Sequence, residues 1–103
     1  YVDPTGNSPF GRWFAALPAP AAARVTIALT RLAQGNFSNV EPVGAGVSEL
    51  KMHFGPGYRV YFGQDGPTLV ILLGGSSKAR QSQAIRVAQQ TWTHYKLQRA
   101  KEN

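Results

Sequence analysis

Residues 49–62, E-L-K-M-H-F-G-P-G-Y-R-V-Y-F, constrain the fold of this chain more than any other stretch. Two runs of alternating side chains flank the turn signal Gly55-Pro56-Gly57, and together they predict a β-hairpin. Because successive side chains of a strand point to opposite faces, the hairpin is expected to have an apolar face and a polar face. The apolar face collects Leu50, Met52, Phe54, Tyr58, Val60 and Phe62, and the polar face collects Glu49, Lys51, His53, Arg59 and Tyr61.

Two helices are predicted before the hairpin. Ser8 and Pro9 are typical of a helix start, as an N-cap followed by proline at the first helical position. A second helix is predicted after Pro18 and Pro20, and it ends at Gly35, because glycine is common just beyond helix C-termini. The apolar stripes that we assign to the core are Phe10, Trp13, Phe14 and Leu17 in the first helix and Val25, Ala28, Leu29 and Leu32 in the second.

The remaining segments complete one α+β domain over residues 1–103. We interpret residues 1–7 as the end of an edge strand whose beginning is missing, since the chain starts without Met. Residues 36–48 are rich in turn formers and predict an irregular loop. Residues 68–73, T-L-V-I-L-L, predict a central strand covered on both faces. A final helix from about Lys78 to the late nineties carries the apolar stripe Ile85, Ala88, Trp92 and Tyr95. The expected architecture is a small antiparallel meander with helices packed against it.

The charge balance favours a polyanionic partner. Eleven Lys and Arg residues against five Asp and Glu residues give a net charge of +6. Between Asp65 and Glu102 the chain carries six basic residues and no acid. Such an excess is typical of proteins that bind nucleic acid or an acidic protein segment, although a basic surface can also serve only solubility.

Several function classes are excluded by residue types. The chain has no cysteine, which excludes disulfides and thiolate chemistry and permits a cytoplasmic location. It has no apolar run near the roughly 18 residues of a membrane span, and we expect no membrane partner. Two histidines and five scattered acids argue against a dedicated metal site, and no phosphate-binding G-x-x-x-x-G-K-[ST] loop occurs. We therefore expect no metal and no cofactor.

Three motifs carry a resemblance to a known family: V-x-E-L-K at 47–51, G-P-G-Y-R-V-Y-F at 55–62 and L-V-I-L-L-G-G-x-x-K at 69–78. With S-P-F-x-R-W-F at 8–14 and L-A-Q-G-N-F at 32–37, they resemble the RelE/ParE toxin superfamily. The closest match is its HigB-like branch of addiction-module killer proteins. The resemblance implies a RelE-like fold, in which helices flank a twisted antiparallel sheet, and a toxin of a type II toxin–antitoxin pair. It also implies a cognate antitoxin that occludes the basic surface. In this branch the antitoxin usually has a helix-turn-helix domain (HigA-like), so operator DNA would be reached only through it.

RelE-like and HigB-like members cleave mRNA, usually in the ribosomal A site and without metal, so mRNA and the ribosome are the implied partners. Such cleavage needs a base for the 2′-hydroxyl, cations for the phosphate and an acid for the leaving oxygen. Arg59 matches the phosphate-binding arginine of the ribonuclease members, and Lys78 at the final helix start is the second expected phosphate contact. The candidates for proton transfer are Glu49, Lys51 and His53, and those for RNA binding are Arg80, Tyr61 and Arg86.

Alternatives stay open at this point. Arg59 could be a surface arginine paired with Glu49 or Asp65, and Glu49 could serve only to orient Arg59. His94 and Tyr95 echo terminal residues that act in some ribonuclease members, but on a helix they fit packing or solvent exposure better. ParE-like members share the fold and poison DNA gyrase without catalysis, and an inactive relic would bind only its antitoxin.

Overall fold

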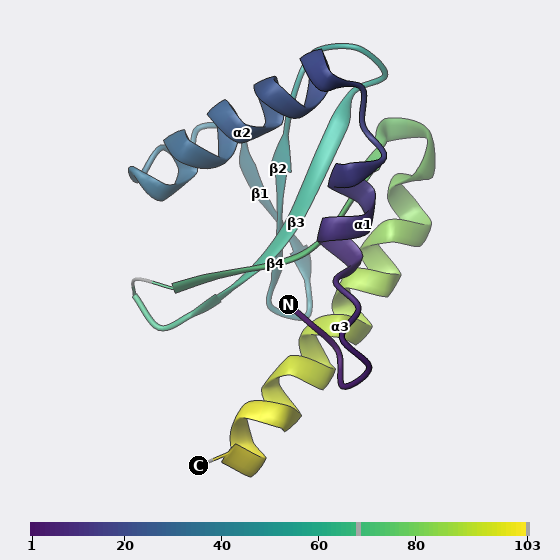
Figure 1. The fold of residues 1–103 in the computed structure, drawn as a ribbon. Coiled ribbons are helices and arrows are strands. Elements are labelled where there is room, and N and C mark those ends of the chain that lie inside the picture. Colours follow the sequence, from purple (N-terminus) through teal and green to yellow (C-terminus); the bar gives the residue numbers. More distant parts are fainter. Residues whose placement is uncertain (68, 103) are drawn as a thin grey trace.

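The computed structural model describes residues 1–67 and 69–102, in which three α-helices accompany a four-stranded antiparallel sheet (Figure 1). The predicted α+β class and the antiparallel meander are confirmed, since the strands pair in chain order. The strands are β1 (Val40–Gly44), β2 (Val47–Lys51), β3 (Tyr58–Asp65) and β4 (Leu69–Ser77). The helices are α1 (Pro9–Ala15), α2 (Ala19–Ala33) and α3 (Gln81–Glu102), and a 3-10 turn, η1 (Lys78–Arg80), directly precedes α3.

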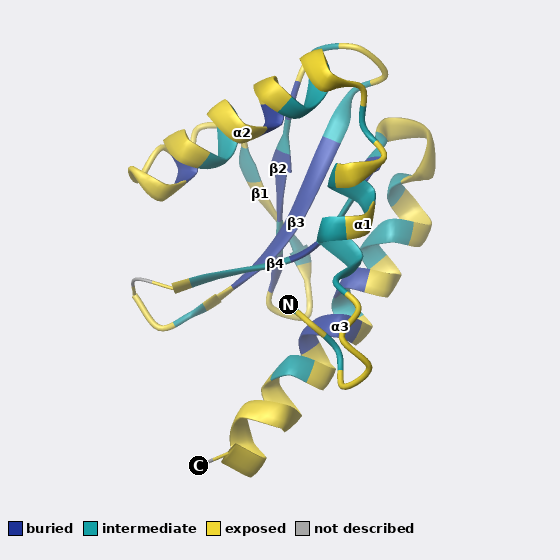
Figure 2. Cartoon of the chain, in the orientation of Figure 1, coloured by how far each residue is buried: buried dark blue, intermediate teal, exposed yellow. Residues whose placement is uncertain are grey.

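Helices cover both faces of the sheet, and buried residues are concentrated on β2 and β3, with others on β4 and on the facing sides of α2 and α3 (Figure 2). One core cluster joins the sheet to α1 and α2, and the other joins it to α3. The predicted apolar face of the hairpin is confirmed, because its side chains belong to the first cluster. The predicted polar face is closed to solvent in part, since α3 lies across it and Glu49, Arg59 and Tyr61 are buried there. None of the helices within 1–67 and 69–102 is both long and apolar enough to cross a membrane.

Two helix boundaries follow the predicted capping residues. The Ser8 hydroxyl oxygen accepts a hydrogen bond from the Gly11 N–H at 2.9 Å, which satisfies a free donor at the start of α1. Gly35, just beyond α2, adopts a left-handed φ of +91° that favours glycine. Its N–H donates to the Leu32 carbonyl and the Asn36 N–H to the Arg31 carbonyl, as in a Schellman motif.

The prediction of an irregular loop over residues 36–48 was wrong, because this segment contains β1 and the start of β2. β1 is an edge strand, and Pro42 lies opposite Ser48 there. Proline lacks a backbone donor and is tolerated at sheet edges, so the turn-forming composition concealed a short strand. Ala45, in the connecting turn, has a positive φ of 56°, which is uncommon for a residue other than glycine.

β4 lies at an edge of the sheet, not at its centre as predicted. Its two faces are nevertheless covered, since Val70 and Leu72 pack in the first cluster and Ile71 and Leu73 in the second. This coverage explains the continuous apolar run of β4. Thr68, the first residue of the predicted strand, lies outside the described residues. The Tyr1 ammonium donates to the Leu72 carbonyl at 3.0 Å, so the described N-terminus lies beside the β4 edge, although residues 1–7 form turns and not a strand.

Candidate functional site

The polar residues of the hairpin form a buried ion pair beneath the start of α3. Glu49 on β2 and Arg59 on β3 expose only 1% and 6% of their surfaces. The Arg59 Nε lies 3.8 Å from the Glu49 Oε1, an ion-pair distance that is too long for a hydrogen bond. Gln81, the first residue of α3, donates from its Nε2 to the Glu49 Oε2 at 2.7 Å. The helix start is thereby tied to the acid of the pair.

The Arg59 guanidinium is incompletely bonded. Its Nη1 donates a long bond of 3.3 Å to the Tyr58 carbonyl. Its buried Nε makes no hydrogen bond with any residue that the structure describes. Leaving a buried donor unsatisfied costs roughly 1–3 kcal/mol, and more when the group is charged. Buried polar groups without partners are rare in folded proteins, and Arg59 is therefore a candidate functional residue.

Lys78 approaches Arg59 at the turn between β2 and β3. A Cβ atom placed on Gly57 would lie 3.8 Å from both the Arg59 Nη1 and the Lys78 Cδ. The Lys78 N–H also faces the Pro56 carbonyl, at 3.4 Å. Gly57 has a φ of +76°, a backbone conformation that favours glycine, and a Cβ atom there would lie only 3.2 Å from the Lys78 Cβ. Two positive side chains converging on one turn favour an anion between them.

Lys51 and His53 do not join the Glu49–Arg59 pair in the way the alternation predicts. Lys51 lies opposite Arg59, but its Nζ pairs with the Glu41 Oε2 of β1 at 2.7 Å. This hydrogen bond from Lys51 lowers the pKa of Glu41 below its ordinary value. β2 ends at Lys51, so His53 lies outside the ladder, exposed, and the expectation that it shares the polar face was wrong.

The three predicted RNA contacts fall into two groups. Arg80 and Arg86 are exposed, on η1 and α3. Tyr61 is completely buried against α3, and its hydroxyl shares a 3.0 Å hydrogen bond with the Ser76 hydroxyl. Its assignment as a direct RNA contact was therefore wrong, because a side chain enclosed on all sides cannot stack on a base.

The structure also places three side chains that were named among the alternatives. Asp65 is not a partner of Arg59, since its Oδ2 lies 3.2 Å from the Arg99 Nε and accepts a hydrogen bond from the Tyr95 hydroxyl. Tyr95 stacks on Trp92 with ring centroids 5.2 Å apart, as expected for packing. His94 is exposed on α3.

Sequence reasoning missed Gln81 and Ser76 as members of this polar network. The sequence feature that could have indicated this network was the apolar stripe on the final helix, of which Ala88 and Trp92 are buried in the second cluster. That stripe requires a sheet face to pack against. With the first face covered by two helices, the polar face of the hairpin was the one available.

The burial of Tyr61 predicts that the stability of the fold depends measurably on pH in the alkaline range. Burial raises the pKa of Tyr61 above its ordinary value of 10.0, so the fold favours the neutral phenol. The contribution of the neutral phenol to the free energy of unfolding is complete below pH 10 and is lost as the pH rises through the raised pKa. We expect the free energy of unfolding to fall less steeply above pH 10 in Tyr61→Phe than in the native protein, measured by urea unfolding at successive pH values. Equal slopes in the two proteins would contradict this account.

Comparison with known proteins places the chain in a family. An uncharacterized protein of Haemophilus influenzae is 38% identical to it over 80 residues, which are 77% of this chain and 81% of that protein. The chain belongs to the same family as this Haemophilus protein. The shared region is long enough that the Haemophilus relative is expected to have the same α+β fold. No family model matches the chain, and no solved structure matches it. The name of the Haemophilus relative states no activity, so function is argued from the site.

Proposed function

We propose that this chain is a RelE/ParE-type toxin of the HigB-like branch, with a RelE-like fold, that cleaves mRNA on the ribosome without metal. The observation that supports this most is the convergence of an incompletely bonded Arg59 and Lys78 at the Gly57 turn. A guanidinium fork and an ammonium suit a phosphodiester whose negative charge grows during cleavage. The net charge of +6 would attract the RNA.

The proposed reaction is transesterification by the RNA itself. The 2′-oxygen attacks the phosphorus and loses its proton to a base, while the bond from phosphorus to the 5′-oxygen breaks and that oxygen takes a proton from an acid. The products are a 2′,3′-cyclic phosphate and a free 5′-hydroxyl. Arg59 and Lys78 would hold the phosphate throughout.

Glu49 fits a positioning role better than the role of base. Both of its oxygens face neighbours, Gln81 on one side and Arg59 on the other, and it is almost fully buried. Of the other two proton-transfer candidates, Lys51 lies opposite Arg59 and is partly exposed, whereas His53 lies off this face. A phosphate would approach Arg59 from the Gly57 turn, beside which the Arg59 Nη1 lies.

The partners of the proposed toxin are mRNA, the ribosome and a cognate antitoxin of the helix-turn-helix, HigA-like kind, in the cytoplasm. The exposed basic residues of η1 and α3 give an antitoxin a cationic surface to cover. Operator DNA would be bound by the antitoxin and not by this chain.

The test is to add the protein to translating ribosomes and to map mRNA ends by primer extension. New ends are expected with the native protein, and Arg59→Lys is expected to reduce cleavage by about 10²–10³-fold, because lysine keeps the charge but loses the fork. Arg12→Lys, an exposed arginine on α1, is the matched control and should cleave normally. Thermal unfolding of each variant checks the fold. Normal cleavage by Arg59→Lys would sink the assignment of the phosphate site.

A second candidate function is supported by the burial of the ion pair. Glu49 and Arg59 are enclosed, whereas Arg80 and Arg86 are exposed where α3 begins. A ParE-like inhibitor of DNA gyrase needs an exposed binding surface and no open catalytic groups. Absence of mRNA cleavage, combined with gyrase-dependent DNA damage, would favour this candidate.

A further inference from the structure

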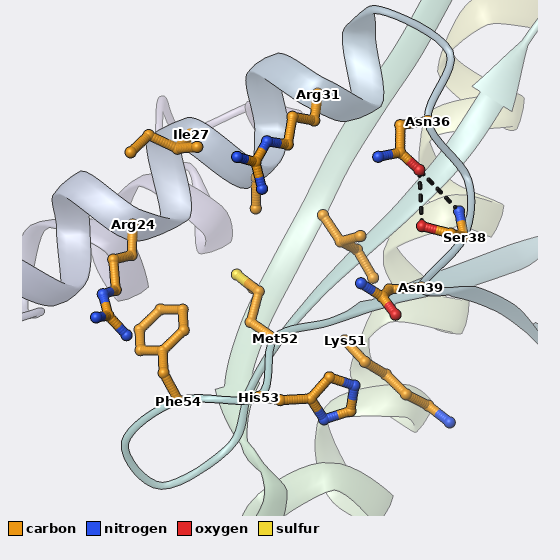
Figure 3. Close-up of a pocket in the computed structure, with 12 residues that line it drawn as sticks. Arg24, Ile27, Arg31, Asn36, Ser38, Asn39, Lys51, Met52, His53 and Phe54 are labelled. Atoms are coloured by element: carbon orange, nitrogen blue, oxygen red, sulfur yellow. Dashed lines mark hydrogen bonds between the residues drawn. The ribbon is translucent and has the colours of Figure 1, made fainter.

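A groove of about 350 Å³ separates α2 from the chain that leaves β2 (Figure 3). α2 contributes Arg24, Ile27 and Arg31 to one wall, and Met52, His53 and Phe54 lie across from them. Arg24 reaches from α2 toward Phe54 on the opposite wall, the Arg31 side chain lies along α2, and Met52 points toward the helix. A concave site of this size is large enough to take a few side chains of a bound segment.

The rim of this groove carries positive charge that is not neutralised by ion pairs within the described residues. Arg24 and Arg31 lie two helical turns apart, and neither forms an ion pair with a carboxylate in the part of the chain that the structure describes. The Arg24 guanidinium is held 5.0 Å from the centre of the Phe54 ring, which fixes its position. Exposed His53 adds a third nitrogen donor on the opposite wall. A ligand of this groove is therefore expected to be acidic.

The groove also needs an apolar ligand group. Ile27 lies between the two arginines and is 51% exposed, which leaves a large aliphatic side chain in water. The floor includes Met52, a flexible side chain that adapts to different apolar partners. A simple anion would satisfy the arginines and leave Ile27 uncovered. An acidic segment with an aliphatic anchor would satisfy both.

RNA fits these walls less well than a peptide does. Single-stranded RNA is usually held by stacking of bases on free aromatic faces. Phe54, the aromatic ring of this groove, has Arg24 over it and the Tyr58 ring 5.3 Å away, so its surfaces are already in use.

We propose that this groove binds an acidic amphipathic segment of a partner protein, with aliphatic residues on Ile27 and Met52 and carboxylates on Arg24 and Arg31. The inference does not depend on RNA cleavage, since the groove lies on the α2 side of the sheet and the Glu49–Arg59 pair lies on the α3 side. Helix-in-groove recognition uses this combination of apolar anchors and flanking charge.

The probe is a fluorescein-labelled amphipathic helical peptide of Glu, Leu, Ile and Ala, compared with a shuffled peptide of the same composition. Binding is followed by fluorescence anisotropy and by amide chemical shifts of the labelled protein. We expect the patterned peptide to bind more tightly than the shuffled one and to shift the amides of Arg24, Ile27, Arg31 and Met52. Arg31→Glu and Ile27→Asp, both at exposed positions, should each weaken binding by at least about tenfold.

Two controls separate this site from general attraction to a basic protein. Arg12→Glu makes the same charge change outside the groove and should leave the affinity nearly unchanged. A peptide with Lys in place of Glu should bind the Arg31→Glu variant more tightly than it binds the native protein. The proposal is overturned if the patterned peptide fails to bind, if its shifts fall on α3 instead, or if a single-stranded RNA oligonucleotide displaces it from the groove.

Discussion

Glu49→Ala is expected to lower the free energy of unfolding by about 3–5 kcal/mol, the cost of removing one partner of a buried ion pair. The substitution would leave Arg59 buried with no opposite charge beside it, since Glu49 is the acid that faces its guanidinium. It would also free the Gln81 amide that now donates to Glu49, and so release the start of α3. The measurement is urea unfolding followed by tryptophan fluorescence.

Glu41→Ala is the matched control for Glu49→Ala. Glu41 also pairs with a cation across the sheet, but at an exposed position where such a pair contributes at most about 1 kcal/mol. The combined variant Glu49→Leu with Arg59→Met should recover much of the loss, because the desolvation cost disappears when no charge is buried. Equal losses in Glu49→Ala and Glu41→Ala would show that α3 does not enclose the pair.

Gly75→Ala is expected to destabilise the fold by about 1–3 kcal/mol, the usual cost of overpacking a core. A Cβ atom at Gly75 would approach atoms of the Trp13 ring to within 2.2–2.6 Å, and a rigid ring between α1 and β4 cannot simply rotate away. For a domain of this size, each 1 kcal/mol corresponds to roughly 4–8 °C in melting temperature. Differential scanning calorimetry measures the shift.

Gly74→Ala provides a neighbouring control on the same strand. A Cβ atom there would meet no heavy atom within 4 Å, so the melting temperature is expected to change little. Replacing Trp13 with Leu in the Gly75→Ala background should recover part of the loss if the ring causes it. A melting temperature lowered equally by both alanine substitutions would point to backbone flexibility, and not the Trp13 contact, as the role of these glycines.

The fold was predictable where local signals and hydrophobic period agree. Ser8 and Gly35 marked helix ends through hydrogen bonds that depend on only a few neighbouring residues. β1 was not predictable in this way, because Pro42 suits an edge strand and an irregular loop equally well. The edge position of β4 was equally hidden, since an apolar run reports that both faces are covered and not which neighbours are hydrogen-bonded.

The candidate site was predictable in part. The alternation of the hairpin put Glu49 and Arg59 on one face, and the structure pairs them. The alternation gave the wrong position for His53, because the last paired residue of a strand is set by the turn that follows. It also gave no sign that α3 would cover this face, since a polar pattern usually faces solvent and its burial depends on contacts between distant segments.

The burial of β3 has a consequence for how this protein tolerates change. Five consecutive residues, from Arg59 to Gly63, are buried, and the strand is shared by the core clusters on both sides of the sheet. A substitution on either side of the strand therefore disturbs the backbone on which the other cluster rests. Sequence drift in this family should consequently be slow along β3 and faster in β1, whose residues are mostly exposed.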